Sequence, residues 1–233
     1  MHARGVVKDF QNGSSLTRVL HGVDLEIESG RLTLLVGPSG CGKTTLLSIM
    51  TGILSPSAGE VDVMDVCITS LRGSKKVLFR REHLGFIFQQ YNLLPALTAA
   101  ENAAIPLVAG GLSLAEAARR ARVTLSRIGM AEHAEKRPNQ LSGGQMQRVA
   151  IARALVHAPS VIVCDEPTAA LDEETGRKVM EILREIASDP ANAVLVVTHD
   201  NRVYHFADRI VTMNDGLITG EMTPPRAAEG AHA

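Results

Sequence analysis

The feature that most constrains the fold of this chain is a glycine-rich octapeptide that follows a solid apolar run at residues 32–36. It reads Gly37-Pro38-Ser39-Gly40-Cys41-Gly42-Lys43-Thr44, and a helical stretch that we expect to end at Gly52 comes after it. An apolar run of this kind suits a strand that is covered on both faces of a parallel sheet. Between such a strand and a helix, the pattern G-x-x-x-x-G-K-[ST] predicts a phosphate-binding loop.

The loop has the residue types that hold polyphosphates. Its glycines let backbone N–H groups point at the phosphates, and the positive end of the following helix adds to that field. We expect Lys43 to contact the β and γ phosphates and the Thr44 hydroxyl to ligate Mg²⁺, with Thr45 also in the nucleotide site. An ordinary glycine-rich turn is the alternative, and it would require neither Lys43 nor Thr44.

Further strands are predicted on both sides of a helical middle. Apolar runs at 161–163 and 193–197 resemble the run before the loop and indicate buried parallel strands. Alternating apolar residues at 19–27 indicate a half-buried strand. Asn214-Asp215-Gly216, between two short apolar stretches, predicts a hairpin. The core is therefore expected to be α/β.

Two capping-box patterns open the predicted helices of the middle region. Thr98 is followed by Glu101, and Ser113 by Glu116, with Gly129 expected to end the second helix. Because helices cluster between strands, we expect a helical sub-domain at about 97–157, inserted into a single domain that covers 1–222. The Pro- and Ala-rich tail, 223–233, is expected to be disordered.

Composition excludes several classes of protein. With 233 residues, of which 45% are hydrophobic and 21% charged, the chain is expected to fold as a globular protein. A net charge of -1 argues against non-specific binding of nucleic acid. The apolar runs are far shorter than the roughly 20 residues of a membrane span, and the N-terminus lacks a secretory pattern. The scattered Cys41, Cys67 and Cys164 favour a reducing compartment, so we expect a cytoplasmic location.

Two adjacent carboxylates, Asp165 and Glu166, end the second buried run. Ligands of α/β sheets bind at the carboxyl ends of parallel strands. There Asp165 suits a Mg²⁺ site, where it would hold metal-bound water, and Glu166 would polarise the water that attacks the γ-phosphate. The alternative is that the two acids form a helix N-cap or a solvated acidic turn. The presence of a phosphate loop in the same chain weakens that alternative.

The segment Leu141-Ser142-Gly143-Gly144-Gln145 opens a helix that we expect to run to about His157. Ser142 and Gln145 have the spacing of a capping box, but two consecutive glycines are not needed there and cost about 1 kcal/mol each inside a helix. Their bare backbone N–H groups form a second anion site. One chain has no use for two γ-phosphate sites unless the two sites belong to different copies.

Residues 141–145 resemble the signature motif of the ATP-binding cassette (ABC) ATPase family, and the rest of that family's pattern follows over nearly the whole chain. The resemblance implies that Phe10, where tyrosine is commoner, stacks on adenine, and that Gln89 reaches the metal. It implies that Asp172 lies in a loop that crosses the dimer interface, where Ala169 lacks the hydroxyl of many relatives. It also implies that His199 contacts the γ-phosphate.

The resemblance implies a fold and an assembly. The fold is a P-loop NTPase core with a mainly parallel sheet, an N-terminal antiparallel β subdomain and an inserted helical subdomain. Two copies would meet head to tail, each phosphate loop facing the partner's Ser142 and Gly144, with ATP and Mg²⁺ between them. ATP would close this dimer and hydrolysis would reopen it. Separate transmembrane permease subunits would respond through a groove beside Gln89, at the cytoplasmic face of the membrane.

Within the family, residues 80–95 are similar to ATPases of macrolide-efflux and lipoprotein-release systems, which favours export or extraction over import. Four basic residues lie in or near this segment: Lys75, Lys76, Arg80 and Arg81. They could face anionic lipid, but a solvated charged surface is the favoured interpretation. A soluble ABC ATPase without a membrane partner is the main alternative. A small-molecule kinase with the same loop would not explain residues 141–145.

Overall fold

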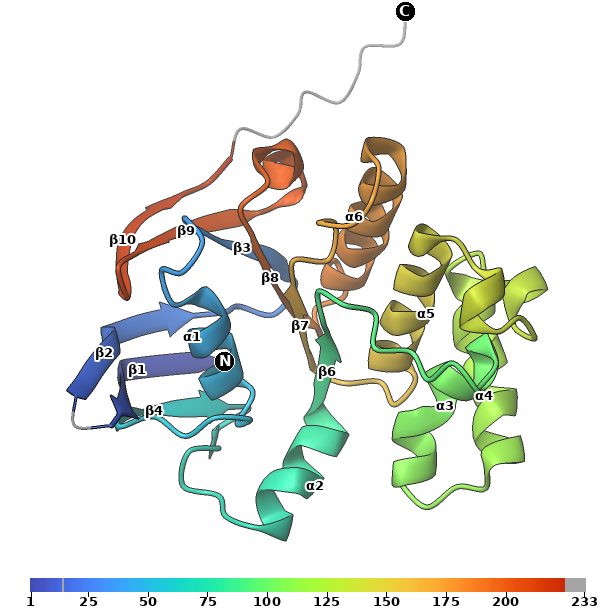
Figure 1. The fold of residues 1–233 in the computed structure, drawn as a ribbon, viewed down its shortest axis with the longest axis horizontal. Helices are drawn as coiled ribbons and strands as arrows, with labels where there is room; N and C mark the ends of the chain where they lie inside the picture. The colour runs from blue at the N-terminus through green and yellow to red at the C-terminus, as the bar shows by residue number, and fades with distance from the viewer. Residues whose placement is uncertain (14, 225–233) are drawn as a thin grey trace, which may run out of the picture.

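The computed structural model describes residues 1–13 and 15–224 and has the predicted α/β architecture (Figure 1). Within these residues, one sheet has the order β2-β1-β4-β5 and a larger one the order β10-β9-β3-β8-β7-β6. The strands are β1 (His2–Asn12), β2 (Ser15–Glu26), β3 (Arg31–Val36), β4 (Ala58–Val63), β5 (Val66–Cys67), β6 (Leu84–Ile87), β7 (Val161–Asp165), β8 (Ala193–Thr198), β9 (Arg209–Asn214) and β10 (Leu217–Met222).

The larger sheet is parallel from β9 to β6, as the apolar runs predict. Every residue of β8 is buried, and in β3 only Arg31 is exposed, because both strands are covered on both faces. β10 returns antiparallel to β9 across Asp215 and Gly216, whose φ values of 43° and 73° suit a two-residue turn. The predicted hairpin is thus confirmed. The smaller sheet is antiparallel, as expected for the N-terminal subdomain.

The helices are α1 (Lys43–Met50), α2 (Ser74–His83), α3 (Ala99–Ala109), α4 (Leu114–Arg127), α5 (Gly143–Leu155) and α6 (Glu173–Ala187), with 3₁₀ turns η1 (Ala131–His133), η2 (Pro138–Gln140) and η3 (Asn201–Phe206). The capping box at Thr98 is complete. At Ser113 only half of it forms: Glu116 donates its N–H to Ser113, but its carboxylate binds Arg119 and Arg120 instead. α5 ends at Leu155, short of the expected His157.

Three apolar clusters hold these elements together. The first joins the antiparallel sheet and α1 to one face of the larger sheet, and the second packs α6 on the opposite face. The third lies among α3, α4 and α5, which form the group at the right of Figure 1. α5 packs against both the α/β core and the helical group, because Ile151 lies in the second cluster and Val149 in the third. The boundaries at about 97 and 157 therefore stay a prediction.

Most of the tail expected to be disordered, 225–233, lies outside the described residues. Over the residues that are described, no helix combines the length and the apolar character that crossing a membrane requires. All three cysteines are free thiols, with Cys41 and Cys164 buried.

Candidate functional site

A cavity of about 570 Å³ opens at the carboxyl ends of β3, β7 and β8 and brings most of the predicted site residues together. Its walls are Val19, Pro38, Ser39, Gly40, Gly42, Lys43, Thr44, Thr45, Gln89, Asp165, Glu166, Val197 and His199. Val19 and Val197 are the two that sequence reasoning missed. They are ordinary β-strand residues, and only the packing of their strands around the loop places them there.

The glycine-rich loop takes the shape that its residues allow. Gly40 and Gly42 have φ values of 82° and 104°, where a residue with a Cβ is strained, and Gly42 caps the start of α1. Lys43 Nζ donates to the carbonyl oxygens of Gly37 at 2.7 Å and Pro38 at 2.8 Å, so the ammonium group lies within the loop. The Cys41 side chain packs into the core beneath, its N–H donates to the carbonyl oxygen of Pro38 at 3.4 Å, and its carbonyl oxygen accepts from the N–H of Gly216 at 2.9 Å.

Asp165 ends β7 beside the start of α1. Burial raises the pKa of its carboxyl group, and the adjacent charge of Glu166 raises it further. A hydrogen bond from the Thr44 hydroxyl and the charge of Lys43 partly offset this effect. A carboxylate and a hydroxyl thus share one corner of the cavity, and Gln89 lines the same space. Oxygen donors of this kind are those that Mg²⁺ prefers, so these residues fit that ion.

Glu166 follows Asp165 but lies in a different backbone conformation and makes different contacts. Its φ of 50° is in the left-handed region, which is uncommon for a residue other than glycine. His199 Nδ1 lies 2.7 Å from Glu166 Oε1, and the Thr198 hydroxyl donates to Oε2 at 3.3 Å. Because a carboxylate can only accept, His199 carries its proton on Nδ1, which leaves Nε2 directed away from Glu166. The carboxylate is therefore oriented from two sides.

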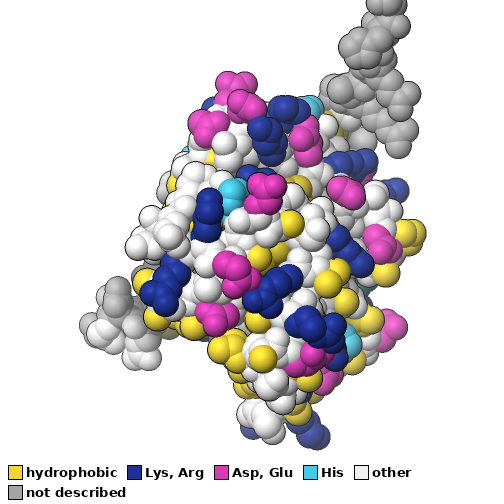
Figure 2. Space-filling view, turned by 90° about the vertical axis from the view of Figure 1, so that its right-hand side faces the viewer, with side chains coloured by type: hydrophobic (Ala, Val, Ile, Leu, Met, Phe, Trp, Pro, Cys, Tyr) yellow, Lys and Arg dark blue, Asp and Glu magenta, His cyan; other side chains and the backbone are white. Residues whose placement is uncertain are grey.

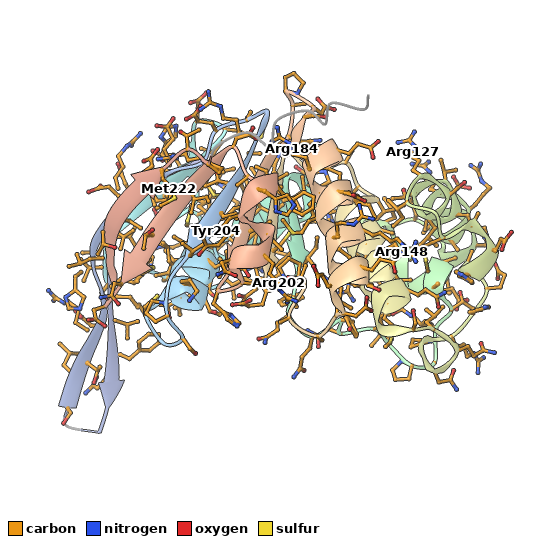
Figure 3. All side chains as sticks on the ribbon, turned by 90° about the horizontal axis from the view of Figure 1, so that it is seen from above. Arg127, Arg148, Arg184, Arg202, Tyr204 and Met222 are labelled. Atoms are coloured by element: carbon orange, nitrogen blue, oxygen red, sulfur yellow. The ribbon has the colours of Figure 1, made fainter. Side chains whose placement is uncertain are left out.

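The signature segment forms the N-terminus of α5, outside the cavity. Ser142 Oγ accepts the N–H of Gln145 and Gln145 Oε1 accepts the N–H of Ser142, so the predicted capping box is confirmed. In Figure 1, α1 and α5 lie on opposite sides of β7, and Figure 3, which labels Arg148 on α5, shows the same separation from above. One chain therefore presents its phosphate loop and its signature segment at separate places.

The two glycines of this segment have a packing reason that the sequence did not suggest. A Cβ on Gly144 would overlap the Cγ2 methyl of Thr175 in the first turn of α6. A Cβ on Gly143 would lie 3.0 Å from the hydroxyl of Tyr91. The absence of a side chain at these two positions thus lets Thr175 and Tyr91 of the same chain pack closely against α5, in addition to any role in anion binding.

Besides the signature segment, two further predicted residues lie away from the cavity, and Gly37 and Cys41 of the loop are not among the residues that line it. Phe10 is on β1, paired with Thr17 of β2; the residue is 40% exposed, and Lys8 Nζ lies 5.1 Å from the ring centroid. Asp172 is the N-cap of α6, where it accepts from the backbone N–H of Thr175 at 3.0 Å and from its hydroxyl at 2.7 Å. These hydrogen bonds lower the pKa of Asp172. Their predicted contacts with nucleotide and partner stay predictions.

Sequence comparisons identify the family of this chain. The family model described as ABC transporter matches residues 20–169. The chain is 42% identical over 226 residues to the lipoprotein-releasing system ATP-binding protein LolD 1 of Caulobacter vibrioides, covering 97% of each chain. It is 44% identical over 222 residues to the macrolide export ATP-binding/permease protein MacB of Burkholderia pseudomallei. That match covers 95% of this chain but 34% of the relative.

A solved structure provides the corresponding fold. The dimeric ATP-binding cassette MJ0796, in a post-hydrolysis state with ADP and Pi, superposes with a TM-score of 0.87 at 39% identity. The superposition covers 95% of this chain and 97% of that one. The chain therefore belongs to the ABC transporter family and is one of its ATP-binding, ATP-hydrolysing subunits.

Proposed function

We propose that the cavity is the ATP site of a subunit that powers a membrane transporter, with Glu166 as the general base for hydrolysis. The observation that carries this proposal is the double contact of Glu166 with His199 and Thr198, beside Lys43. A carboxylate oriented at the edge of a phosphate cavity can accept a proton from an attacking water. Lys43 would exchange its loop carbonyls for phosphate oxygens, and His199 would direct Nε2 toward the γ-phosphate.

Thr44 and Asp165 would hold Mg²⁺, with Gln89 completing the oxygen donors. When bound, the ion neutralises phosphate charge, which lowers the cost of bringing ATP beside two carboxylates. The raised pKa of Asp165 agrees with this role, because a cation at this corner would compensate a carboxylate that burial leaves poorly solvated. Phe10 would stack on adenine from the antiparallel sheet.

A second copy of the chain would complete each site. The cavity contains the phosphate loop but not Ser142 to Gln145, and the signature end of α5 presents N–H groups of its own. Head-to-tail pairing would place Ser142, Gly143 and Gly144 of one chain over the nucleotide of the other, with Asp172 near the shared interface. The dimeric cassette with ADP and Pi supports pairing of this kind.

The partner in the membrane would be a permease on another polypeptide. The segment around Gln89 exposes two large apolar side chains, Phe88 and Leu94. The names of the lipoprotein-release and macrolide-export relatives support export or extraction over import. The subunit would work at the cytoplasmic face of the membrane. Figure 2 shows Lys and Arg interspersed with Asp and Glu on the helical face, which supports a protein partner rather than a nucleic acid.

Glu166→Gln tests the catalytic proposal. The amide keeps the shape of the side chain but cannot accept the proton, so turnover should fall by roughly 10²-fold or more while ATP still binds. Size-exclusion chromatography with ATP should then show a dimer accumulating. Near-normal turnover would remove Glu166 from this role. Co-purification with a membrane protein separates a transporter subunit from the soluble ABC ATPase alternative.

A further inference from the structure

The signature segment is contacted by a histidine that lies outside every motif of the sequence. His133, at the end of η1, places Nε2 3.0 Å from Nε2 of Gln145. Gln145 is the residue that closes the capping box on Ser142. The side-chain amide of Gln145 therefore has two neighbours, one on each end, and only one of them belongs to the segment itself.

The hydrogen bonds determine which atoms donate. Gln145 Oε1 accepts the backbone N–H of Ser142 at 2.9 Å, so its Nε2 must be the donor toward His133. His133 Nε2 is then the acceptor, and the neutral imidazole carries its proton on Nδ1. Rotating the Gln145 amide by 180° would oppose two N–H donors at Ser142. His133 thus stabilises the one amide orientation that closes the capping box.

The position of His133 is itself held by the start of another helix. The backbone N–H groups of Ala99 and Ala100, in the first turn of α3, donate to the carbonyl oxygens of Lys136 and Ala134. First-turn N–H groups have no partner inside their own helix, so these bonds tie the segment after η1 to α3. The imidazole is consequently a fixed acceptor rather than a mobile surface group.

We infer that His133 is a positioning residue for the signature segment: it orients Gln145 and so sets the geometry with which the Ser142 end of α5 meets the nucleotide of a partner chain. This inference rests on the proposed head-to-tail site. The orientation has a cost, since among the described residues His133 Nδ1 is a buried atom without a hydrogen-bond partner. A side chain chosen only to fill space would avoid that cost.

Two substitutions of His133 separate positioning from folding. His133→Leu keeps bulk but removes the acceptor, and we expect kcat to fall roughly threefold to tenfold, the range for one lost neutral hydrogen bond. His133→Gln offers an acceptor oxygen at a similar reach and should restore kcat to near wild type. Affinity of the isolated chain for a fluorescent ATP analogue should not change in either variant, because His133 does not line the cavity.

His157 provides the matched control. It follows the other end of α5, where Nε2 contacts the carbonyl oxygen of Leu84 at 3.1 Å, and its Nδ1 is likewise buried without a partner among the described residues. His157→Leu should lower the melting temperature as much as His133→Leu does, or more, but leave kcat of the folded protein unchanged. Equal losses of kcat in the two Leu variants would overturn the inference.

Mixed dimers locate the defect. When His133→Leu is mixed with Lys43→Ala, one site joins the sound loop of the first chain to the sound signature of the second. Heterodimers should therefore exceed the activity of both homodimers, as a reference pair of Ser142→Arg with Lys43→Ala should also do. Recovery by the reference pair alone would place the His133 defect outside the signature and overturn the inference.

Failure of the proposed shared site is distinguishable from failure of this inference. If the reference pair also stays inactive, the shared site is wrong, while the contrast between His133→Leu and His133→Gln still decides whether the acceptor matters. A kcat that is reduced equally in both His133 variants, or in neither, contradicts the positioning role.

Discussion

At the scale of single residues, two adjacent acids differ because their surroundings differ. Asp165 is the last residue of β7 and is partly desolvated, which raises the pKa of its carboxyl group. Glu166 leaves the strand direction with a positive φ and directs its carboxylate to His199 and Thr198. Strained backbone at a functional site persists when its contacts hold it, and here two neighbouring side chains do so.

Asp165→Asn should raise stability at neutral pH while reducing hydrolysis. Because the folded-state pKa lies above the usual 3.8, the protonated form stabilises the fold at low pH and that stability is lost as pH rises through the folded pKa. An amide has no charge to desolvate. Thermal unfolding between about pH 4 and pH 8 should show the advantage of the variant growing with pH.

Asp172→Asn is a control for which we expect the opposite change in stability at neutral pH. Hydrogen bonds from Thr175 lower the pKa of Asp172, so its ionised form contributes stability above the unfolded pKa that is lost as pH falls. Removing the charge should therefore lower the melting temperature at neutral pH. An advantage for Asp165→Asn that is constant across pH would contradict the desolvation argument.

At the scale of elements, the strands and helices with local signals are the ones that sequence predicts. Some signals span only a few residues and determine structure at that place. They are the solid apolar runs of β3, β7 and β8 and the capping boxes at Thr98 and Ser142. α6 was missed although its buried Val179, Met180 and Leu183 have helical spacing. Every residue of α2 is at least partly exposed, so α2 has no buried face to produce a pattern.

The candidate site follows the same division. Residues 37–44 are contiguous, so one motif predicts where they lie, and six of them line the cavity. Other contacts join segments that are far apart along the chain or have no regular sequence pattern. Val19 reaches the cavity, Thr175 lies against Gly144, and His133 contacts Gln145. Only the packing of whole elements brings such pairs together, which is why the sequence did not reveal them.

The approach of α5 to α6 predicts the effect of Gly144→Ala. The added methyl would overlap Cγ2 of Thr175, which cannot rotate away because its hydroxyl is bound to Asp172, so the melting temperature should fall. Adding Thr175→Ser removes the obstructing methyl, keeps the hydroxyl and should restore stability. We expect kcat to stay low in the double variant, since anion binding needs bare backbone; full recovery would mean that packing alone requires the glycine.

A second link between elements is Arg153 of α5, which donates to the carbonyl oxygens of Tyr91 at 2.8 Å and Asn92 at 2.7 Å. Burial lowers the pKa of its guanidinium. Arg153→Met should cost about 2 kcal/mol of unfolding free energy, as charged hydrogen bonds do. Arg153→Lys, with one point donor, should lose less. Urea denaturation measures both, and equal losses would show that the two carbonyl contacts add nothing beyond the charge.

At the scale of the whole molecule, the separation of the phosphate loop from the signature segment is the feature that most needs explanation. The two ends lie on different elements, and the α3–α5 group holds the signature through its own apolar cluster and through His133. Arg153 joins that group to the segment after Gln89, which lines the cavity. A partner's signature over each cavity would thus be connected to the segment after Gln89 of its own chain.

Mixing two inactive chains tests the shared site most directly. Lys43→Ala damages the loop and spares the signature, whereas Ser142→Arg blocks the signature and spares the loop. Both homodimers should be nearly inactive, and heterodimers confirmed by mass should regain ATPase activity, rising toward half that of wild type. With Glu166→Gln added to both chains, each heterodimer should retain one ATP; heterodimers that retain none would contradict the account.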